Sequence, residues 1–325
     1  MKKRTKILLT LAALIAGAWY WLLIDNRPGN DVAPLDIAAL RSAANAVPGE
    51  KGTGIAVETA ARGALPETLL VAGASITSGP QGVHAFRVDI PGGGVIIDTG
   101  MDQAAADAMG VYKLDPRAQT RIVAALPSAR VIVVTHEHLD HIGGVLTSAD
   151  WPRISQKALI TREQFDHPEE TNPVVWPDGS RQSFKPHDYE GAKGIAPGVA
   201  VMKAASHTPG SQIIFVQLAD GREFLFMGDI SSMDRNWRET RARSRLVGDV
   251  IINEERSAVF AWLKAFKAVS EANPKLVLVP SHDSGRIDAM VAEGRFTRGF
   301  KPAGALCDAA VPPCAPSPKP AIIPR

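Results

Sequence analysis

Cysteine is scarce in this chain: its 325 residues contain only two, Cys307 and Cys314. Both belong to the stretch CDAAVPPC near the C-terminus, and neither has the surroundings of a catalytic nucleophile or of a cysteine-ligated zinc site. Chemistry that depends on a thiolate is therefore not expected. If the protein is exported, the two residues could close a short loop as a disulfide, and two free thiols in a tail are the alternative.

A surplus of charge is missing as well. The 36 basic and 34 acidic residues leave a formal net charge of only +2. Five basic residues and one acidic residue at positions 1–27 more than account for this charge, so the rest of the chain is slightly acidic. Such a body has no electrostatic attraction for nucleic acid, and we expect a small-molecule substrate instead.

One long stretch without charge stands at the N-terminus. The run Ile7–Ile24 follows the basic segment MKKRTK and has the length that spans the core of a bilayer. Its aromatic stretch WYW suits the membrane interface, and the basic flank predicts that the N-terminus stays in the cytoplasm. We expect an uncleaved single-pass anchor in the inner membrane, with the catalytic domain in the periplasm. A signal peptide cleaved near Ala18, after the small residues AGA, is the alternative.

The pattern along the chain predicts four segments: a signal-anchor at 1–27, a linker with a short helix at 28–52, a catalytic domain at 53–300 and a Pro-rich tail at 301–325. Within the domain, strand-like apolar runs come in hairpin-like groups that helical patterns separate. We find no internal repeat. This order predicts an α/β (α+β) fold in which sheets pack face to face with helices outside.

Four segments carry more specific expectations. The run ETLLVAGASI at 67–76 is expected to form a strand. The segment 164–194 is polar and aperiodic, and it is either a lid over the site or a surface insertion. The basic stretch 234–245 is either a solvated helix or an attractor of acidic substrates. Residues 253–272 are expected to form a helix that Asn253 caps and whose apolar face is Val259, Phe260, Leu263, Phe266 and Val269.

The stretch VIVVTHEHLDHIGG, at 131–144, places three histidines, a glutamate and an aspartate within six positions directly after an apolar strand. If the extended geometry persists past the strand, His136 and His138 point to one side and the intervening glutamate to the other. Two imidazoles on one side can hold one metal ion. Asp140 and His141, at the start of the following helix, face a second point. Imidazole and carboxylate suit zinc and tolerate iron or manganese.

Three further ionisable residues stand at strand ends later in the chain. His207 in ASHTPGSQ, Asp229 in FLFMGDI and His282 in LVLVPSHD each follow an apolar run. Side chains at the ends of several strands can converge on one edge of a sheet. A single histidine in such a place is more often structural than a ligand, but five histidines and two carboxylates indicate a metal site.

The order HEHLDH, SHTPGS, MGD and PSHD resembles the metallo-β-lactamase superfamily, whose HxHxDH motif and later His, Asp and His it matches residue by residue. The segment IIDTG is similar to the first motif of the superfamily, and the resemblance covers about residues 68–285. It implies a four-layer αββα sandwich with the site along one edge, preceded here by the N-terminal anchor helix. It also implies that Asp98 is structural or supports a ligand.

The resemblance further implies two metal ions, which we expect to be zinc, with iron or manganese possible. The first ion would be held by His136, His138 and His207. The second would be held by Asp140, His141 and His282, and Asp229 would bridge the two. Asp140 and Asp229 would be the catalytic residues. Two divalent ions about 3.5–4 Å apart can share a water and lower its pKa, which gives a bridging hydroxide at neutral pH.

The expected reaction is hydrolysis of an ester or lactone. Lactonases that act on quorum signals are nearest in outline, because they share the size, the bridging aspartate and a motif close to HTPGSQ. The tyrosine that supplies their acid is replaced here by Ser232, and Tyr112 or Tyr189 could take its place. A persulfide dioxygenase-like oxidoreductase with one iron is the alternative outside hydrolysis. A phosphodiesterase or β-lactamase-like hydrolase of the same fold is the alternative within it.

Overall fold

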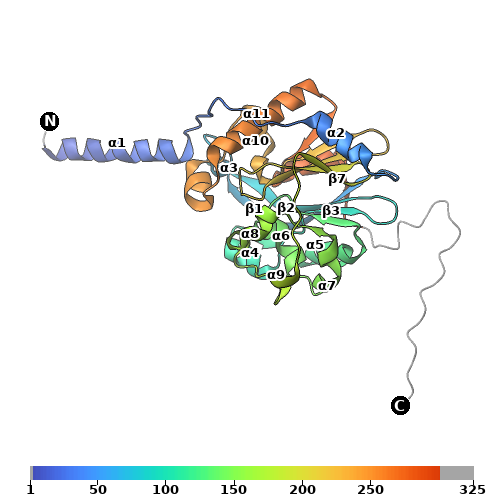
Figure 1. Ribbon diagram of the computed structural model, residues 1–325. Coiled ribbons are helices and arrows are strands. Elements are labelled where there is room, and N and C mark those ends of the chain that lie inside the picture. Colours follow the sequence, from blue (N-terminus) through green and yellow to red (C-terminus); the bar gives the residue numbers. More distant parts are fainter. Residues whose placement is uncertain (1–2, 301–325) are drawn as a thin grey trace, which may run out of the picture.

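Two β-sheets packed face to face form the body of the protein (Figure 1). The structure is a computed structural model, and it describes residues 3–300. The predicted pair Cys307 and Cys314 and the predicted tail at 301–325 lie outside the described residues.

The first sheet has seven strands in the order β12-β1-β2-β3-β5-β6, with β4 paired to β1. Strands β1 and β2 form a long antiparallel hairpin, whereas β3, β5 and β6 run parallel to one another. Parallel strands end at the same edge of a sheet, so the segments that follow β3 and β5 meet there. The strand bounds are β1 Ile55–Pro66, β2 Ser78–Val88, β3 Val95–Ile97, β4 Tyr112–Leu114, β5 Val131–Val133, β6 Ala158–Leu159 and β12 Thr297–Arg298.

The second sheet has five strands in the order β11-β10-β9-β8-β7. Neighbours from β7 to β10 are antiparallel, and β11 is parallel to β10. Strands β8, β10 and β11 consequently run in one direction and end at one edge. The strand bounds are β7 Ala192–Ala196, β8 Val199–Lys203, β9 Gln212–Gln217, β10 Glu223–Phe226 and β11 Leu276–Val279.

Helices cover the outer face of each sheet (Figure 1). The first sheet is covered by α4 (Gln103–Met109), α5 (Pro116–Ala125), α6 (Leu139–Leu146), α7 (Trp151–Ile154), α8 (Arg162–Asp166) and α9 (Ser180–Ser183). The second sheet is covered by α2 (Ile37–Ala46), α10 (Asp234–Glu239) and α11 (Arg256–Ala272). Between the sheets lies a core that includes Phe86, Val133, Ile214 and Phe226. The layers follow the predicted αββα order.

The strand predicted at 67–76 is wrong. This segment forms α3 (Glu67–Leu70) and a turn that joins β1 to β2. The turn is closed by the Thr68 N–H, which donates to the Ser75 carbonyl at 2.9 Å. The two long strands of a hairpin need a reversal of the chain between them, and here a helical turn buries the apolar residues Leu70 and Val71 during that reversal.

The helix predicted at 253–272 is α11, and its five predicted apolar residues are buried. Asn253 does not cap it, so that part of the prediction is wrong. The backbone of Asn253 is left-handed, with φ 62°, and it ends the preceding turn η5 (Leu246–Ile252). Glu255 caps α11 by accepting from the Ser257 N–H. Asparagine tolerates the left-handed region as well as the N-cap position, so its residue type does not separate the two roles.

Two other predicted segments also contain regular structure. The short helix expected within 28–52 is α2, which buries Leu40 and Ala44 against the second sheet. The segment 164–194 is no single loop, because it contains the end of α8, the turn η3 (Pro168–Thr171), α9 and the start of β7.

Helix α1 (Lys3–Leu23) projects from the domain, with none of its residues buried (Figure 1). It has 21 residues with a mean hydropathy of 1.7 over its most apolar window. By length and composition it can cross a membrane, and a signal sequence has the same properties.

Candidate metal centre

All seven predicted ligand residues meet at one edge of the two sheets. His136 and His138 follow β5, and Asp140 and His141 open α6. The other three follow strands of the second sheet that end at the same edge: His207 after β8, Asp229 after β10 in the turn η4 (Gly228–Ser231), and His282 after β11. Of these seven side chains, all but His138 are buried.

Three imidazoles form the first cluster. The Nδ1 atom of His138 lies 3.1 Å from the Nε2 atom of His136 and 3.1 Å from the Nε2 atom of His207. Two ligands of one tetrahedral zinc ion, each 2.0–2.1 Å from it, are about 3.3 Å apart. The three nitrogens therefore have the separation of donors that share one ion.

The second cluster contains one carboxylate and two imidazoles. The Oδ2 atom of Asp140 lies 3.5 Å from the Nε2 atom of His141 and 3.5 Å from the Nε2 atom of His282. Potential ligand atoms of these three residues lie within 4.8 Å of one another. The start of α6 thus contributes to a second point, as the sequence predicts.

Asp229 lies between the clusters. Its Oδ1 atom is 2.9 Å from the Nε2 atom of His282 and 3.4 Å from that of His141. Its Oδ2 atom is 3.6 Å from the Nε2 atom of His207. One oxygen faces each cluster, which is the placement that a bridging carboxylate requires.

The nitrogen of each histidine that faces away from the clusters has a polar neighbour. Such partners fix the orientation of a ligating imidazole and raise its basicity. The pairs are His136 with Thr135 Oγ1 at 3.1 Å, His138 with Glu170 at 3.3 Å, His141 with Asp98 at 2.9 Å, His207 with Glu254 at 3.0 Å, and His282 with the Gly82 carbonyl at 2.8 Å.

Asp98 fixes the loop that carries the HxHxDH motif. It follows β3 with a left-handed backbone, φ 59°, and its carboxylate accepts from the Thr135 N–H at 2.7 Å. The same carboxylate lies against His141. It therefore ties the ends of β3 and β5 to α6, in agreement with a supporting role.

Glu137 points away from the clusters, as the alternation of an extended chain predicts. Its carboxylate accepts from the Thr208 hydroxyl at 2.7 Å and from the Gly210 N–H at 2.8 Å. Burial raises the pKa of Glu137, although these two hydrogen bonds act against that rise. The residue joins the HxHxDH loop to the turn that carries His207.

Arg243 lies at the metal centre, although no motif in the sequence predicts this position. Its side chain is only 3% exposed, and it donates to Asp229 Oδ2 at 2.8 Å and to Glu254 Oε2 at 2.9 Å. It also donates to the Ser232 hydroxyl at 2.5 Å. The chain turns inward at Thr240, whose backbone is left-handed, directly after α10 ends. Within 234–245, the solvated interpretation therefore holds for α10 but not for Arg243.

The charges of the centre shift the pKa values of its histidines in opposite directions. Burial, followed by the nearby Arg243 guanidinium, lowers the pKa of His207 to about 4, so that it is neutral and can donate its lone pair. Burial alone would lower the pKa of His141, but the carboxylates of Asp140 and Asp98 raise it well above its usual value. The surroundings of the second cluster are thus more negatively charged than those of the first.

Of the two tyrosines that could replace the acid of the lactonases, one lies beside the clusters and the other does not. The Tyr112 hydroxyl lies 3.4 Å from His282 Nδ1, and the two rings stack with centroids 5.9 Å apart. The Tyr189 hydroxyl instead donates to Gln212 at 2.6 Å, within the core between the sheets. Tyr112 is therefore the tyrosine that borders the centre.

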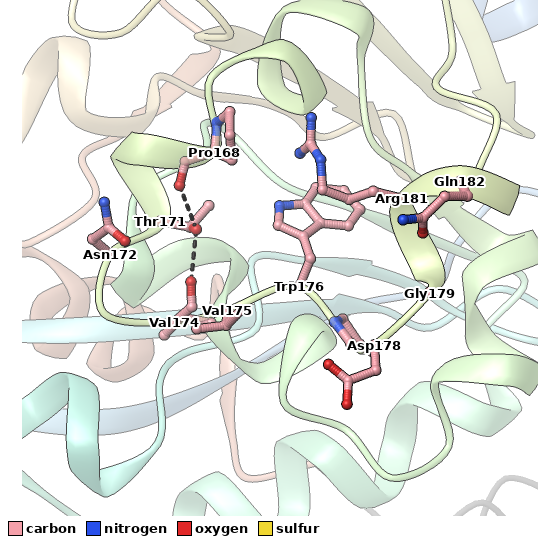
Figure 2. A pocket seen from close by; sticks show the side chains of 11 residues that line it. Pro168, Thr171, Asn172, Val174, Val175, Trp176, Asp178, Gly179, Arg181 and Gln182 are labelled. Atoms are coloured by element: carbon pink, nitrogen blue, oxygen red, sulfur yellow. Dashed lines mark hydrogen bonds between the residues drawn. The ribbon is translucent and has the colours of Figure 1, made fainter.

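In the segment 164–194, Glu170 of η3 lies against the centre, 3.3 Å from the Nε2 atom of His138. Beside η3 lies a surface cavity of about 270 Å³ that residues of the range 168–182 line (Figure 2). Figure 2 shows the Thr171 hydroxyl between the carbonyls of Pro168 and Val174, and the Trp176 indole beside Arg181. None of the seven residues of the two clusters lines this cavity.

A sequence model of the metallo-beta-lactamase superfamily matches residues 78–282, which include both clusters. The chain belongs to the metallo-beta-lactamase superfamily, and it is a metal-dependent hydrolase of that superfamily.

Its relatives lie in the lactonase-like branch. The chain is 24% identical over 181 residues to the N-acyl homoserine lactonase AiiA of Bacillus thuringiensis subsp. kurstaki, with 48% of this chain and 67% of that protein covered. It is 26% identical over 172 residues to an N-acyl homoserine lactonase of a Bacillus species, with 48% and 66% covered. The predicted resemblance to the superfamily and to this branch is confirmed.

Two solved structures show the same fold. One is an N-acyl homoserine lactone hydrolase with the product N-hexanoyl-L-homoserine bound at its catalytic metal center; it has a TM-score of 0.57 and 16% identity, and covers 74% of this chain and 96% of its own. The other is a quorum-quenching N-acyl homoserine lactone lactonase, with a TM-score of 0.57, 18% identity, and 74% and 97% covered.

Proposed function

We propose that this hydrolase uses two metal ions to open a lactone ring or to cleave a carboxylic ester, with N-acyl homoserine lactones as the leading substrate class. The observation that carries the proposal is the placement of Asp229, whose two oxygens face separate donor clusters. The lactonases among the relatives support the choice of substrate class.

The donors suit two zinc ions, and iron or manganese would accept the same set. His136, His138 and His207 would hold one ion; Asp140, His141 and His282 would hold the other, with Asp229 shared. When bound, a pair of such ions activates water for attack and polarises the carbonyl oxygen of the substrate. A persulfide dioxygenase needs one iron, and the second cluster favours the two-metal hydrolase over it.

The residues of the chain supply orientation and proton transfer. Asp140 lies against both histidines of the second cluster, where its carboxylate can accept a proton from the attacking water. As the carbon–oxygen bond of the lactone breaks, the leaving oxygen needs a hydrogen-bond donor. We assign this part to the Tyr112 hydroxyl, because it is the tyrosine hydroxyl beside the second cluster, 3.4 Å from His282 Nδ1.

We further propose that α1 is an uncleaved anchor that holds the domain at the periplasmic face of the inner membrane. The exposed apolar surface of α1 and its basic N-terminal flank support this placement.

The substrate class can be tested with the full-length chain, purified in detergent and loaded with zinc. Proton release should be followed with N-acyl homoserine lactones, aryl esters, thioesters, phosphodiesters and β-lactams. We expect kcat/KM to be highest for a lactone or an ester. A preference of at least tenfold for a phosphodiester or a β-lactam would overturn the proposal.

A further inference from the structure

The C-terminal end of α1 is fixed to the catalytic domain. The Leu23 carbonyl accepts from the Thr68 hydroxyl at 2.9 Å and from the Gly73 N–H at 2.8 Å. These contacts join the last residue of α1 to α3 and to the turn that follows it. The helix is therefore not connected to the domain through a free linker at this point.

The next residues continue the attachment. Asp25 is buried and accepts from the Arg245 guanidinium at 2.9 Å. The Asn26 side chain donates to the Thr240 carbonyl at 3.1 Å and accepts from the Ala242 N–H at 3.1 Å. The chain directly after α1 is held on two sides, by residues 67–73 and by residues 240–245. These contacts fix the direction in which α1 leaves the domain.

Arg245 also contacts α1 near the C-terminal end of the helix. Its guanidinium lies 5.4 Å from the centre of the Trp21 ring, and that ring belongs to the aromatic stretch at the end of the apolar helix. Tryptophan at the end of a membrane span lies at the membrane–water interface. The next element of the chain begins directly after Arg245 and therefore starts close to this level.

The element that follows is η5, with the sequence LVGDVII. Val250 is 60% exposed and Ile251 is 68% exposed. Outside α1, they are the only two neighbouring residues among the large exposed hydrophobic side chains of the described chain. Figure 1 shows this turn, in orange near residue 250, beside the C-terminal end of α1 and on the side of the domain from which α1 projects.

We propose that η5 is a second membrane contact, which inserts Val250 and Ile251 into the interfacial layer of the lipid bilayer beside α1. The inference rests on the anchor role in the proposed function. A bilayer is the occupant because an apolar helix of membrane-spanning length leaves the domain at the same place. The three-residue stretch from Arg243 to Arg245 then touches the metal centre at one end and the anchor at the other.

Depth-dependent quenching tests the contact with the full-length chain. Cys307 and Cys314 are changed to serine, and a bimane probe is attached to Val250→Cys or Ile251→Cys in phosphatidylcholine–phosphatidylglycerol vesicles. Val175→Cys is the matched control, because Val175 is 75% exposed and lines the cavity beside η3. Leu14→Cys in α1, where Leu14 is 65% exposed, is the positive control.

We expect brominated lipids to quench the probes at 250 and 251 at least twofold and to leave the probe at 175 unchanged. Quenching at 14 but not at 250 or 251 would overturn the second contact and leave the anchor standing. An emission change at 250 that follows protein concentration, and not brominated lipid, would show that a second copy of the chain covers η5, which also overturns the proposal.

The outcome is separable from that of the proposed function. The same vesicles are assayed for lactone and ester hydrolysis. Hydrolysis without quenching at 250 and 251 removes the membrane contact alone, whereas quenching without hydrolysis of any substrate leaves the contact and removes the assigned reaction. No quenching at 14 removes the anchor and the second contact together.

Discussion

Removal of the Arg243 guanidinium should cost far more stability without metal than with it. Arg243→Met keeps most of the side-chain volume but removes the guanidinium that pairs with both Asp229 and Glu254. Glu254 is fully buried, and Asp229 is 10% exposed. Breaking a buried ion pair by removing one partner costs about 3–5 kcal/mol. We expect a loss of this size in the free energy of unfolding after treatment with EDTA.

With zinc bound, the loss should be smaller. Two dications beside Asp229 would replace the charge that Arg243 provides, so only Glu254 would be left uncompensated. The matched control is Arg238→Met, because Arg238 pairs with Asp234 but is 52% exposed. Exposed ion pairs contribute less than about 1 kcal/mol, so this variant should be near the wild type in both conditions.

Urea denaturation followed by tryptophan fluorescence measures these differences on the full-length chain in detergent, with EDTA and with zinc. An Arg243→Met variant as stable as the wild type in EDTA would refute the buried ion-pair account. An equal loss with and without zinc would show that bound metal does not compensate Asp229.

Three further outcomes are expected. Asp229→Asn should lower kcat by about 10²-fold or more, because the negative charge shared by the two clusters is lost. KM should change less, and the metal content should fall. Near-normal kcat with both metals retained would contradict the bridging role of Asp229. Tyr112→Phe should lower kcat on the preferred substrate by about 10²-fold. Tyr189→Phe is its control and should cost only about 1 kcal/mol of stability, with kcat unchanged. Alkaline phosphatase fused after Arg325 should be active in the membrane fraction, and an active but soluble reporter would instead indicate cleavage near Ala18.

The convergence of the seven cluster residues could be predicted from the sequence for a physical reason. Each of His136, His207, Asp229 and His282 stands just past an apolar run, and an apolar run of that length forms a buried strand. The direction of the strands then brings their ends to one edge. The layer order of the fold follows from the same alternation of strand and helix patterns.

The residues that support the clusters could not be predicted in the same way. Glu170 lies in the short turn η3, and Arg243 and Glu254 lie outside helices and strands, so no periodic pattern shows which way these side chains point. The inward direction of Arg243 depends on a left-handed residue, Thr240, that is not a glycine and so gives no local sign of a turn. The partners of these three residues are not their neighbours in the sequence and come close only when the chain folds.

A short apolar run also explains why the strand predicted at 67–76 is wrong. The run at 67–76 has the composition of a buried strand, but a segment of this length is also compatible with a buried helical turn. The hairpin between β1 and β2 decides in favour of the turn, and that pairing spans residues that are not neighbours in the sequence.

The metal content of the purified chain tests the central claim most directly. Elemental analysis of the wild type, of Asp229→Asn and of the double variant His138→Ala, His207→Ala should give about two, fewer than two, and about one zinc-like ion per chain. The double variant removes two of the three donors of the first cluster and leaves the second cluster intact. A folded wild type that retains no metal after zinc loading would contradict the account, and a single tightly bound iron would favour the dioxygenase alternative.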